Sequence, residues 1–293
     1  MKLALIGMGI MGKPMAINLK KAGHTVFVHG RRAGTMAEPM AAGCTGCASI
    51  AEAAAQAGII IVMVSDTPDV EAVIFGENGV VAGARPGSVV VDMSTISPTA
   101  TRAFAKRLNA CGIEMLDAPV SGGDVGAINA TLSIMVGGKP EVFERVKPVF
   151  EALGKNIVLV GDNGAGQVAK ACNQIVVAVT IEGVAEALTF ARKNGIDPAK
   201  VRDALMGGFA GSRILEVQGK RMLDNAYPPG FKTRLHRKDM NIVMQTAHEL
   251  GLDLPAAALV TEHLDVLMNA GDAELDSAAV MKVVENLSGM GRE

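Results

Sequence analysis

Residues 2–28 read KLALIGMGIMGKPMAINLKKAGHTVFV, and this stretch decides the fold of the chain. Its apolar pattern predicts a short strand over Lys2–Ile6, a helix over Pro14–Ala22 and a second strand over Thr25–Val28. A G-x-G-x-x-G pattern lies at residues 7–12, between the first strand and the helix. Strand, glycine pattern, helix and strand within about thirty residues form the dinucleotide-binding unit.

Each glycine of this pattern has its own physical reason. Gly7 permits the tight turn after the strand, Gly9 lets a diphosphate approach the backbone, and Gly12 lets the helix pack close to the strand. Ile10 and Met11 complete the loop, and the helix N-terminus offers N–H groups to an anion. The sequence therefore predicts a nucleotide site here.

The end of the second predicted strand indicates which nucleotide binds. NAD sites usually place Asp or Glu there, bonded to the ribose hydroxyls. This chain instead has His29, Gly30, Arg31 and Arg32. Two guanidinium groups without a carboxylate suit a 2′-phosphate, because Arg pairs with phosphate in a bidentate way. The alternative is a pair of solvated turn residues. We expect NADP(H) to be preferred, with NAD(H) possible.

Strand and helix patterns continue to alternate through the first half of the chain. The remaining predicted strands are Ile59–Val64, Ser88–Asp92, Ile113–Leu116, Thr131–Val136 and Ile157–Val160, and the helices are Ile50–Gln56, Asp69–Phe75, Thr99–Ala110 and Glu141–Leu153. This alternation predicts an α/β domain of residues 1–162, built on a Rossmann-type doubly wound parallel sheet.

Two loops that follow predicted strands are candidates for cofactor contacts, because ligands of such sheets bind at the carboxyl ends of the strands. Val64 and Ser65 open one loop, and Thr95 lies in the other. Both loops supply hydroxyls and N–H groups, and both also fit ordinary helix N-caps. Thr95 is the stronger candidate of the two loops.

A third loop, DAPVSGG at residues 117–123, ends in Ser121, Gly122 and Gly123. Successive N–H groups without side-chain obstruction can form an anion-binding nest, and the serine adds a hydroxyl donor. The loop is a candidate carboxylate site, although a Gly-Gly turn is also a common structural feature.

The segment Gly161–Asn194 opens with Gly and Asn and then becomes densely apolar, which predicts one long helix from about Ala165 to Asn194. Lys170 lies near its start, with Asn173 and Gln174 three and four residues on, so all three share one helical face. A helix lysine often only extends its charge to solvent. A lysine beside a cofactor can instead be a proton donor.

No strand pattern follows Asn194. Helices are predicted over Pro198–Met206, Ser212–Leu223, Lys238–Leu250, Pro255–Asn269 and Ser277–Leu287. Residues 163–194 would thus form an interdomain helix and residues 195–293 an all-α domain. Its apolar residues exceed what a small domain needs to bury, which indicates a homo-oligomer. The basic segment Phe231–Asp239, placed before a helix, hints at an anionic neighbour, although a solvated turn fits equally.

Composition excludes several function classes. The net charge is −2, with no Trp and one Tyr, which argues against nucleic-acid binding. The apolar run Gly58–Val64 is far shorter than a membrane span, and strand-like sequence from Lys2 leaves no room for a signal peptide. We expect a cytoplasmic protein. Cys44 and Cys47 form a single C-x-x-C without a second pair, so no metal site is expected.

Four segments, in order, resemble the motifs of the β-hydroxyacid dehydrogenase family, which includes 3-hydroxyisobutyrate and 6-phosphogluconate dehydrogenases. They are GMGIMGKPMAINLKKAGH (cofactor), DAPVSGG (substrate), GAGQVAKACNQ (catalysis) and LHRKDM (C-terminal cofactor motif). The resemblance covers the whole chain. Within the family, ACNQIVVA and GGFAGSRILEVQGKRM are most similar to tartronate semialdehyde reductases. Hydroxyisobutyrate dehydrogenases typically have Asn-Asn where this chain has Asn173-Gln174.

The resemblance implies a role for each matching residue. Lys170 would be the general acid that protonates the aldehyde oxygen, and Asn173, Gln174 or both would orient the substrate. The substrate carboxylate would be held by Ser121, Gly122 and Gly123, and the cofactor and site closure would involve Thr95, Phe231, Lys238 and Asp239. Whether Arg213 reaches the substrate is open.

The implied function is reversible, NADP(H)-preferring reduction of tartronate semialdehyde to glycerate by a homodimer or homotetramer. The substrate is thus a small carboxylate. The alternative substrates are 3-hydroxyisobutyrate, succinic semialdehyde and glyoxylate. From a different class, a non-catalytic NADP-binding sensor also fits the cofactor motif, but such a sensor has no need of a proton donor at Lys170.

Overall fold

The computed structural model describes residues 1–291 and divides the chain into two compact units. The first unit is Met1–Lys170, and the second begins at Ala171. The boundary falls inside one long helix, α9 (Ala165–Lys193).

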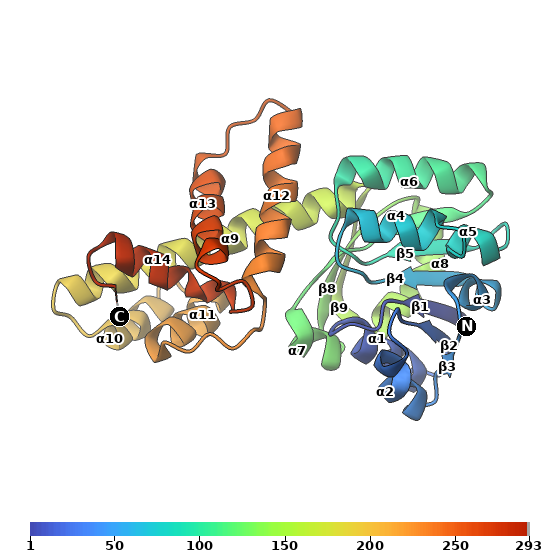
Figure 1. Cartoon of the computed structure of the whole chain (residues 1–293), viewed down its shortest axis with the longest axis horizontal. Coiled ribbons are helices and arrows are strands. Elements are labelled where there is room, and N and C mark those ends of the chain that lie inside the picture. The colour runs from blue at the N-terminus through green and yellow to red at the C-terminus, as the bar shows by residue number, and fades with distance from the viewer. Residues whose placement is uncertain (292–293) are drawn as a thin grey trace. The chain divides into compact units, whose positions relative to one another are not determined.

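The first unit alternates strands and helices, as the sequence predicts (Figure 1). Its strands are β1 (Lys2–Ile6), β2 (Thr25–His29), β3 (Thr45–Gly46), β4 (Ile59–Val62), β5 (Val89–Asp92), β6 (Glu114–Asp117), β7 (Val120–Ser121), β8 (Leu132–Gly137) and β9 (Gly154–Gly161). Its helices are α1 (Gly12–Lys21), η1 (Ala33–Met36), α2 (Ala37–Ala41), α3 (Ile50–Ala55), α4 (Thr67–Phe75), α5 (Val80–Gly83), α6 (Pro98–Ala110), α7 (Gly123–Ile128) and α8 (Pro140–Glu151).

These strands form one sheet with the order β3-β2-β1-β4-β5-β6-β8-β7, and β9 pairs with β8. Every pairing from β3 to β6 is parallel, which confirms the expected Rossmann-type core. The far end differs from a purely parallel sheet. Strand β8 runs antiparallel to β6 and β7, and β9 runs parallel to β8. The reversal arises because only the short β7–α7 segment links β6 to β8, without a long crossover helix.

Helices cover both faces of the sheet, so the sheet is doubly wound. Side chains from α1, α7 and α8 pack against one face, including Met15, Leu19 and Phe150. Side chains from α3, α4, α5 and α6 pack against the other, including Ile74 and Leu108. Because both faces are covered, the central strands are continuous apolar runs, such as the fully buried β4.

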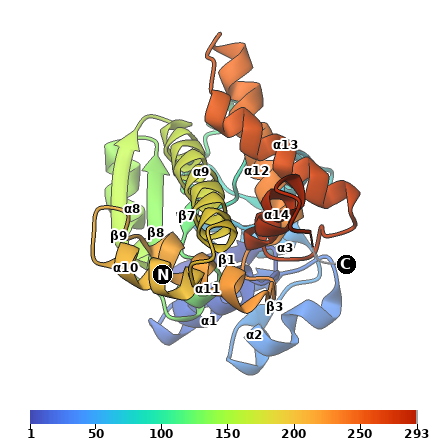
Figure 2. The same ribbon diagram turned by 90° about the vertical axis from the view of Figure 1, so that its left-hand side faces the viewer.

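The second unit is helical throughout its described residues (Figures 1 and 2). After α9 come α10 (Pro198–Met206), α11 (Arg213–Asp224), α12 (Thr233–Glu249), α13 (Pro255–Asn269), η2 (Ser277–Ala279) and α14 (Val280–Leu287). Its core joins residues of α9, such as Ala185 and Leu188, to Leu215 of α11 and Met281 of α14.

Helix α9 has an unusually apolar composition. Within residues 1–291 it is the one helix with the length and hydropathy that could cross a membrane, with a mean hydropathy of 1.5 over 18 residues. Half of that window is buried inside the chain. Core helices of soluble proteins meet the same criterion, and α9 supplies core residues to the second unit. We therefore interpret its composition as that of a core helix.

Helix α12 begins at Thr233, five residues before the start that the sequence suggested. The basic segment therefore forms the first turns of a helix and is not a turn preceding one. Distant carboxylates offset its charge: Lys232 and Arg234 pair with Glu274, and Arg237 pairs with Asp265. These partners are far away in sequence, so charge pattern alone misplaced the boundary.

Candidate active site

The glycine loop after β1 is built as the sequence motif requires. Gly7 has φ +105°, and a Cβ atom there would lie 2.1 Å from the carbonyl oxygen of Met63. A Cβ on Gly12 would lie 1.9 Å from the carbonyl oxygen of Gly7. Gly9, in contrast, has open space on its Cβ side. Gly7 thus forms the turn, Gly12 permits the close packing of the helix, and Gly9 leaves space for a ligand, as the motif predicts.

A cavity of about 530 Å³ opens beside this loop, within the first unit. Residues that the sequence suggested for the cofactor line it, namely Gly7, Gly9, Arg31, Arg32, Val64 and Ser65. Ile10 is exposed on the same loop, and Met11 is half-buried. Thr95 is outside the described lining. The glycine loop and the cavity beside it fit a nicotinamide dinucleotide.

Thr35 also lines this cavity, although no sequence pattern singled it out. Its hydroxyl donates to the carbonyl oxygen of Arg32 at 2.7 Å, and a Cβ on Gly30 would meet that hydroxyl at 2.5 Å. Thr35 follows the arginines by three residues, inside a 3₁₀ turn that no strong pattern predicts.

The loop after β5 lies against the loop after β4. The backbone N–H of Val64 donates to the hydroxyl oxygen of Ser94 at 3.0 Å. Asp66 and Ser97 cap the following helices α4 and α6, so both loops do contain the N-caps that were the alternative interpretation. Thr95 is half-buried in the loop after β5. We propose that it contacts the cofactor.

The segment DAPVSGG forms β7 and the start of α7. Ser121 is half-buried, whereas Gly122 and Gly123 are exposed with φ of +133° and +63°. Only glycine adopts such angles readily, so the two glycines allow the chain to turn between the strand and the helix. The arrangement is compatible with an anion site at Ser121–Gly123.

Lys170 is 7% exposed, and its Nζ donates to the carbonyl oxygen of Val120 at 2.8 Å. The candidate proton donor therefore touches the backbone of the segment that carries the candidate carboxylate site. A lysine that only extends to solvent would not be buried in this way.

Asp117, at the start of the same segment, fixes the beginning of α9. Its carboxylate accepts from the N–H groups of Gly164 at 2.7 Å and Gln167 at 3.0 Å. Burial raises the pKa of Asp117 above its usual range, and these hydrogen bonds partly oppose the shift. A Cβ on Gly166 would lie 2.4 Å from the carbonyl oxygen of Met135, so α9 starts in close contact with the sheet.

In the second unit, two hydrogen bonds and one ion pair link four of the candidate residues. Asn173 Nδ2 donates to Gln174 Oε1 at 2.7 Å, and Gln174 Nε2 donates to Asp239 Oδ2 at 2.7 Å. Lys238 Nζ lies 2.8 Å from Asp239 Oδ1. Gln174 is 3% exposed and uses both ends of its amide within the protein. Asn173 is more exposed, so it is the better placed of the two to meet a ligand.

The loop before α12 is held by Asp276, which is fully buried. Its Oδ2 accepts from the N–H groups of Gly230 at 3.0 Å and Phe231 at 2.8 Å, and it pairs with Arg221. The ring of Phe231 also packs on His236. Arg213 is largely exposed and pairs with Glu216 at 2.6 Å on its own helix.

The structure thus brings the candidate residues together in three groups. Six of the predicted cofactor residues line one cavity, Lys170 contacts the DAPVSGG segment, and Asn173, Gln174, Lys238 and Asp239 are linked. The cavity lining does not include Ile10, Met11, Gly12, Gly30, Thr95 or Phe231. The first two groups lie in the first unit and the third in the second. Helix α9 carries both Lys170 and Asn173 on one face, three residues apart. Among residues 1–291, no cluster of His, Cys, Asp or Glu side chains is arranged to hold a metal.

Two family models match the chain in succession. Residues 2–161 match the NAD binding domain of 6-phosphogluconate dehydrogenase, and residues 164–284 match the NAD-binding model of NADP-dependent 3-hydroxyisobutyrate dehydrogenase. The 2-hydroxy-3-oxopropionate reductase of Escherichia coli is 52% identical over 97% of both chains. The 3-hydroxyisobutyrate dehydrogenase of Pseudomonas aeruginosa is 36% identical over 96% of this chain and 97% of its own.

A solved structure shows the same fold. The 3-hydroxyisobutyrate dehydrogenase of Mycobacterium tuberculosis, solved with L-serine, is 33% identical over 96% of this chain and 98% of its own, with a TM-score of 0.88. Fold, cofactor cavity, motif order and full-length similarity agree. The chain belongs to the 3-hydroxyisobutyrate dehydrogenase-like family, whose members are NAD(P)-dependent β-hydroxyacid dehydrogenases.

Proposed function

We propose that this enzyme reduces tartronate semialdehyde to glycerate reversibly, with NADPH preferred over NADH. One observation carries the proposal: buried Lys170 donates to the backbone of the DAPVSGG segment, so a proton donor adjoins a carboxylate nest. The 52% identity to a 2-hydroxy-3-oxopropionate reductase supports the choice of substrate, because that name denotes the same semialdehyde.

Substrate binding requires groups for a carboxylate and for a carbonyl oxygen. In the proposal, Ser121, Gly122 and Gly123 hold the carboxylate through the serine hydroxyl and the backbone N–H groups of the glycines. Asn173 orients the oxygen that becomes the alcohol. Gln174 and Asp239 hold Asn173 in place, since Gln174 accepts from Asn173 and donates to Asp239.

The bound nicotinamide supplies a hydride to the aldehyde carbon. Lys170, as an ammonium, gives its proton to the carbonyl oxygen, and its charge stabilises the oxyanion before the transfer is complete. The carbonyl oxygen of Val120 limits where the ammonium can lie, which lowers the entropic cost of orienting it. In the oxidation direction, neutral Lys170 accepts the proton of the alcohol, and solvent restores its charge state.

The preference for NADPH rests on the end of β2. Arg31 and Arg32 are both exposed at the mouth of the cavity, where a 2′-phosphate would lie beside the ribose. An aspartate or glutamate at this point would bind the ribose hydroxyls of NADH and repel the phosphate, and the end of β2 has neither. Thr35, beside them, also lines the cavity, and its hydroxyl donates to the carbonyl oxygen of Arg32.

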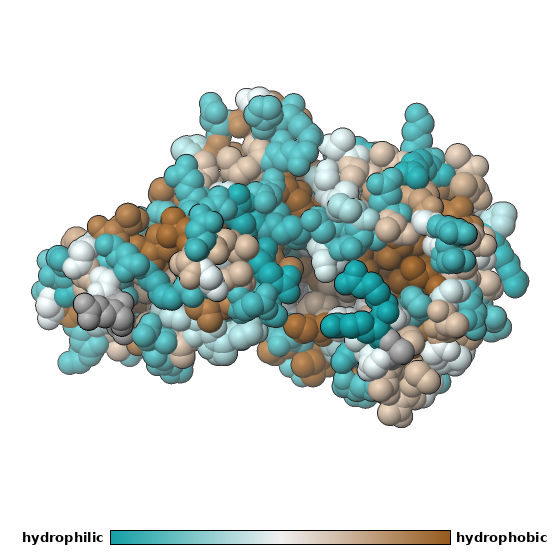
Figure 3. Space-filling view, in the orientation of Figure 1, coloured by the Kyte–Doolittle hydropathy of each residue, from teal (hydrophilic) through white to brown (hydrophobic). Residues whose placement is uncertain are grey.

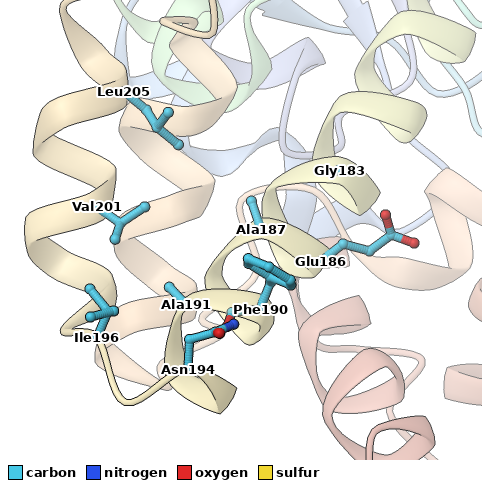
Figure 4. Close-up of a pocket in the computed structure, with 9 residues that line it drawn as sticks. All are labelled: Gly183, Glu186, Ala187, Phe190, Ala191, Asn194, Ile196, Val201 and Leu205. Atoms are coloured by element: carbon cyan, nitrogen blue, oxygen red, sulfur yellow. The ribbon is translucent and has the colours of Figure 1, made fainter.

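A second copy of the chain is the proposed partner. Helix α9 is apolar on most of its surface, yet only half of its most apolar window is buried in one chain. A helix that is apolar all round is normally covered. An open apolar cavity of about 670 Å³ lies between its C-terminal half and α10, lined by Phe190, Ile196, Val201 and Leu205 among others (Figure 4). Figure 3 shows apolar surface gathered on the second unit, where Figure 1 places α9 and α14.

The alternative substrate with specific support is 3-hydroxyisobutyrate, because a full-length relative with 36% identity carries that name. A cofactor-binding sensor without catalysis has no need of a buried lysine against the DAPVSGG segment, so Lys170 argues against it.

The test is a set of initial rates of reduced-cofactor oxidation with tartronate semialdehyde, succinic semialdehyde and glyoxylate, each with NADPH and NADH. We expect tartronate semialdehyde with NADPH to give the highest kcat/KM. Oxidation of 3-hydroxyisobutyrate provides the comparison in the reverse direction. A higher kcat/KM for any of the other substrates would replace tartronate semialdehyde in the proposal.

The cofactor preference is tested separately, with the double substitution Arg31→Ser and Arg32→Ser. We expect the KM for NADPH to rise at least tenfold, because two phosphate contacts are lost, each a charge-assisted bond, while the KM for NADH stays within about twofold. Lys106→Ser, an exposed lysine on α6 that does not line the cavity, is the control. An equal rise for both cofactors would overturn the role of the arginines.

A further inference from the structure

Gln167 is a buried amide that joins two parts of the first unit. It lies on the first turn of α9, and its side chain is 1% exposed. Its Nε2 donates to the carbonyl oxygen of Ser94 at 2.8 Å, and its Oε1 accepts from the N–H of Ile96 at 3.1 Å. The two partners fix the orientation of the amide, because a carbonyl only accepts and a backbone N–H only donates.

The two backbone groups that Gln167 holds flank Thr95, the cofactor candidate in the loop after β5. The amide of Gln167 therefore bonds to the backbone on both sides of Thr95, with one donor and one acceptor, as a neighbouring β-strand would. Both groups would be buried without partners if the amide were absent, and such groups are costly to leave unpaired. The position of Thr95 is thus set from α9.

The network continues from this loop to the cofactor cavity. Ser94 accepts at its hydroxyl from the N–H of Val64, which lines the cavity. The N–H of Ser94 in turn donates to Asp92 Oδ1 at 3.0 Å. A continuous set of hydrogen bonds therefore runs from the cavity wall through Ser94 to Gln167.

On the other side, Gln167 shares its helical face with Lys170, three residues further on. The backbone N–H of Gln167 donates to Asp117, so this turn of α9 is fixed from two directions. A helix is stiff over one turn. A shift of Gln167 relative to the Ser94–Ile96 loop would displace the ammonium of Lys170 by a similar amount.

We propose that Gln167 is a positioning residue that sets the register between the cofactor loop at Thr95 and the helix that carries Lys170. The role rests on the proposed function of Lys170 as proton donor. Gln167 touches neither substrate nor cofactor in this role. It acts by holding the reacting groups in one geometry, and displacements near 1 Å can cost about 100-fold in rate.

The test is steady-state kinetics of Gln167→Ala and of the nearly isosteric Gln167→Glu. The carboxylate keeps an acceptor for Ile96 but loses the donor to Ser94, and it opposes a carbonyl oxygen. We expect kcat to fall about 10- to 100-fold in both variants, with the KM for the semialdehyde within about threefold of wild type. The cofactor dissociation constant, from NADPH fluorescence, should rise by less than tenfold.

The matched control is Asn163→Ala. Asn163 lies just before α9, and its side chain donates to the backbone carbonyl oxygen of Met115 in the same unit at 2.8 Å, away from the Thr95 loop. We expect a comparable fall in melting temperature with kcat nearly unchanged. Equal losses of kcat in Asn163→Ala and Gln167→Ala would show that Gln167 has only a structural role. A normal kcat in Gln167→Glu would also contradict the positioning role.

The variants are compared with wild type on whichever substrate and cofactor wild type turns over fastest. Failure of the substrate proposal therefore leaves this test intact. If Gln167→Ala yields no folded protein, Gln167→Glu and Gln167→Met, which keep most of the side-chain volume, carry the comparison with their melting temperatures measured alongside.

Discussion

Substitution of Lys170 should lower the rate of the reaction without weakening the binding of the cofactor. In Lys170→Ala the cavity that takes the cofactor is untouched, because Lys170 does not line it. Loss of a general acid typically costs 10²–10⁴-fold in rate. We expect kcat to fall by about that factor, and the NADPH dissociation constant, measured by fluorescence titration, to stay within about twofold.

Lys193→Ala, an exposed lysine near the other end of α9, is the matched control and should keep wild-type rates. Lys170→Arg keeps a positive charge but is a far weaker proton donor at neutral pH, so it should remain as impaired as Lys170→Ala. Full activity in either Lys170 variant would eliminate the proposed mechanism.

The functional importance of single residues could be predicted where the residue type or its spacing is typical of a known kind of site. The three glycines of the cofactor loop, and Lys170 on its helical face, could be singled out from the sequence. Gln167 and Asp117 could not, although both lie inside motifs that were recognised. Their function depends on backbone groups of distant segments, at Ser94, Ile96 and Gly164, and no local pattern encodes such partners. A three-residue spacing from Lys170 was the only signal for Gln167.

Among the structural elements, the start of α9 depends on a charge that burial disfavours. Burial raises the pKa of Asp117 in the folded protein, more than its hydrogen bonds lower it. The folded state therefore binds this proton more tightly than the unfolded chain does. The contribution of Asp117 to stability is fully present below its unfolded pKa of about 3.9 and is lost as pH rises through the raised folded value.

Asp117→Asn should reveal this dependence, because the amide does not titrate. We expect the melting temperature of wild type minus that of the variant to decrease as pH rises from about 4 towards neutrality. The lost acceptor for Gly164 or Gln167 adds a constant offset and does not change the sign of the trend. Calorimetry at several pH values measures it, and a difference that grows with pH would show that the hydrogen bonds outweigh burial.

Elements with their own apolar period were predicted to within a few residues, as β1, α10 and α13 show. The sequence analysis missed β7 and α7, because a two-residue strand followed by two glycines has no period of its own. It also could not give the direction of β8, since a strand carries the same alternation whether its neighbour is parallel or antiparallel. The early start of α12 depended on Glu274 and Asp265, which are distant in sequence.

At the scale of the whole molecule, the apolar excess of the second unit is explained only in part by its own core. Phe190 is 73% exposed and Ile196 53%, both at the cavity between α9 and α10. Figure 4 shows Phe190 beside that cavity, on the turn of α9 nearest to Asn194. In a monomer these groups would remain in water, at a cost of about 25 cal/mol per Å² of apolar surface.

Phe190→Glu tests whether a second copy covers this surface. A charge buried at an interface without a partner is strongly unfavourable, so we expect light scattering to show wild type as a dimer or tetramer and the variant shifted to the monomer mass. Val266→Glu introduces the same charge at a 49% exposed position on α13 and should leave the mass unchanged. A monomeric wild type would contradict the proposed assembly. An oligomeric Phe190→Glu would instead move the interface away from the α9–α10 cavity, because a glutamate there would then face solvent.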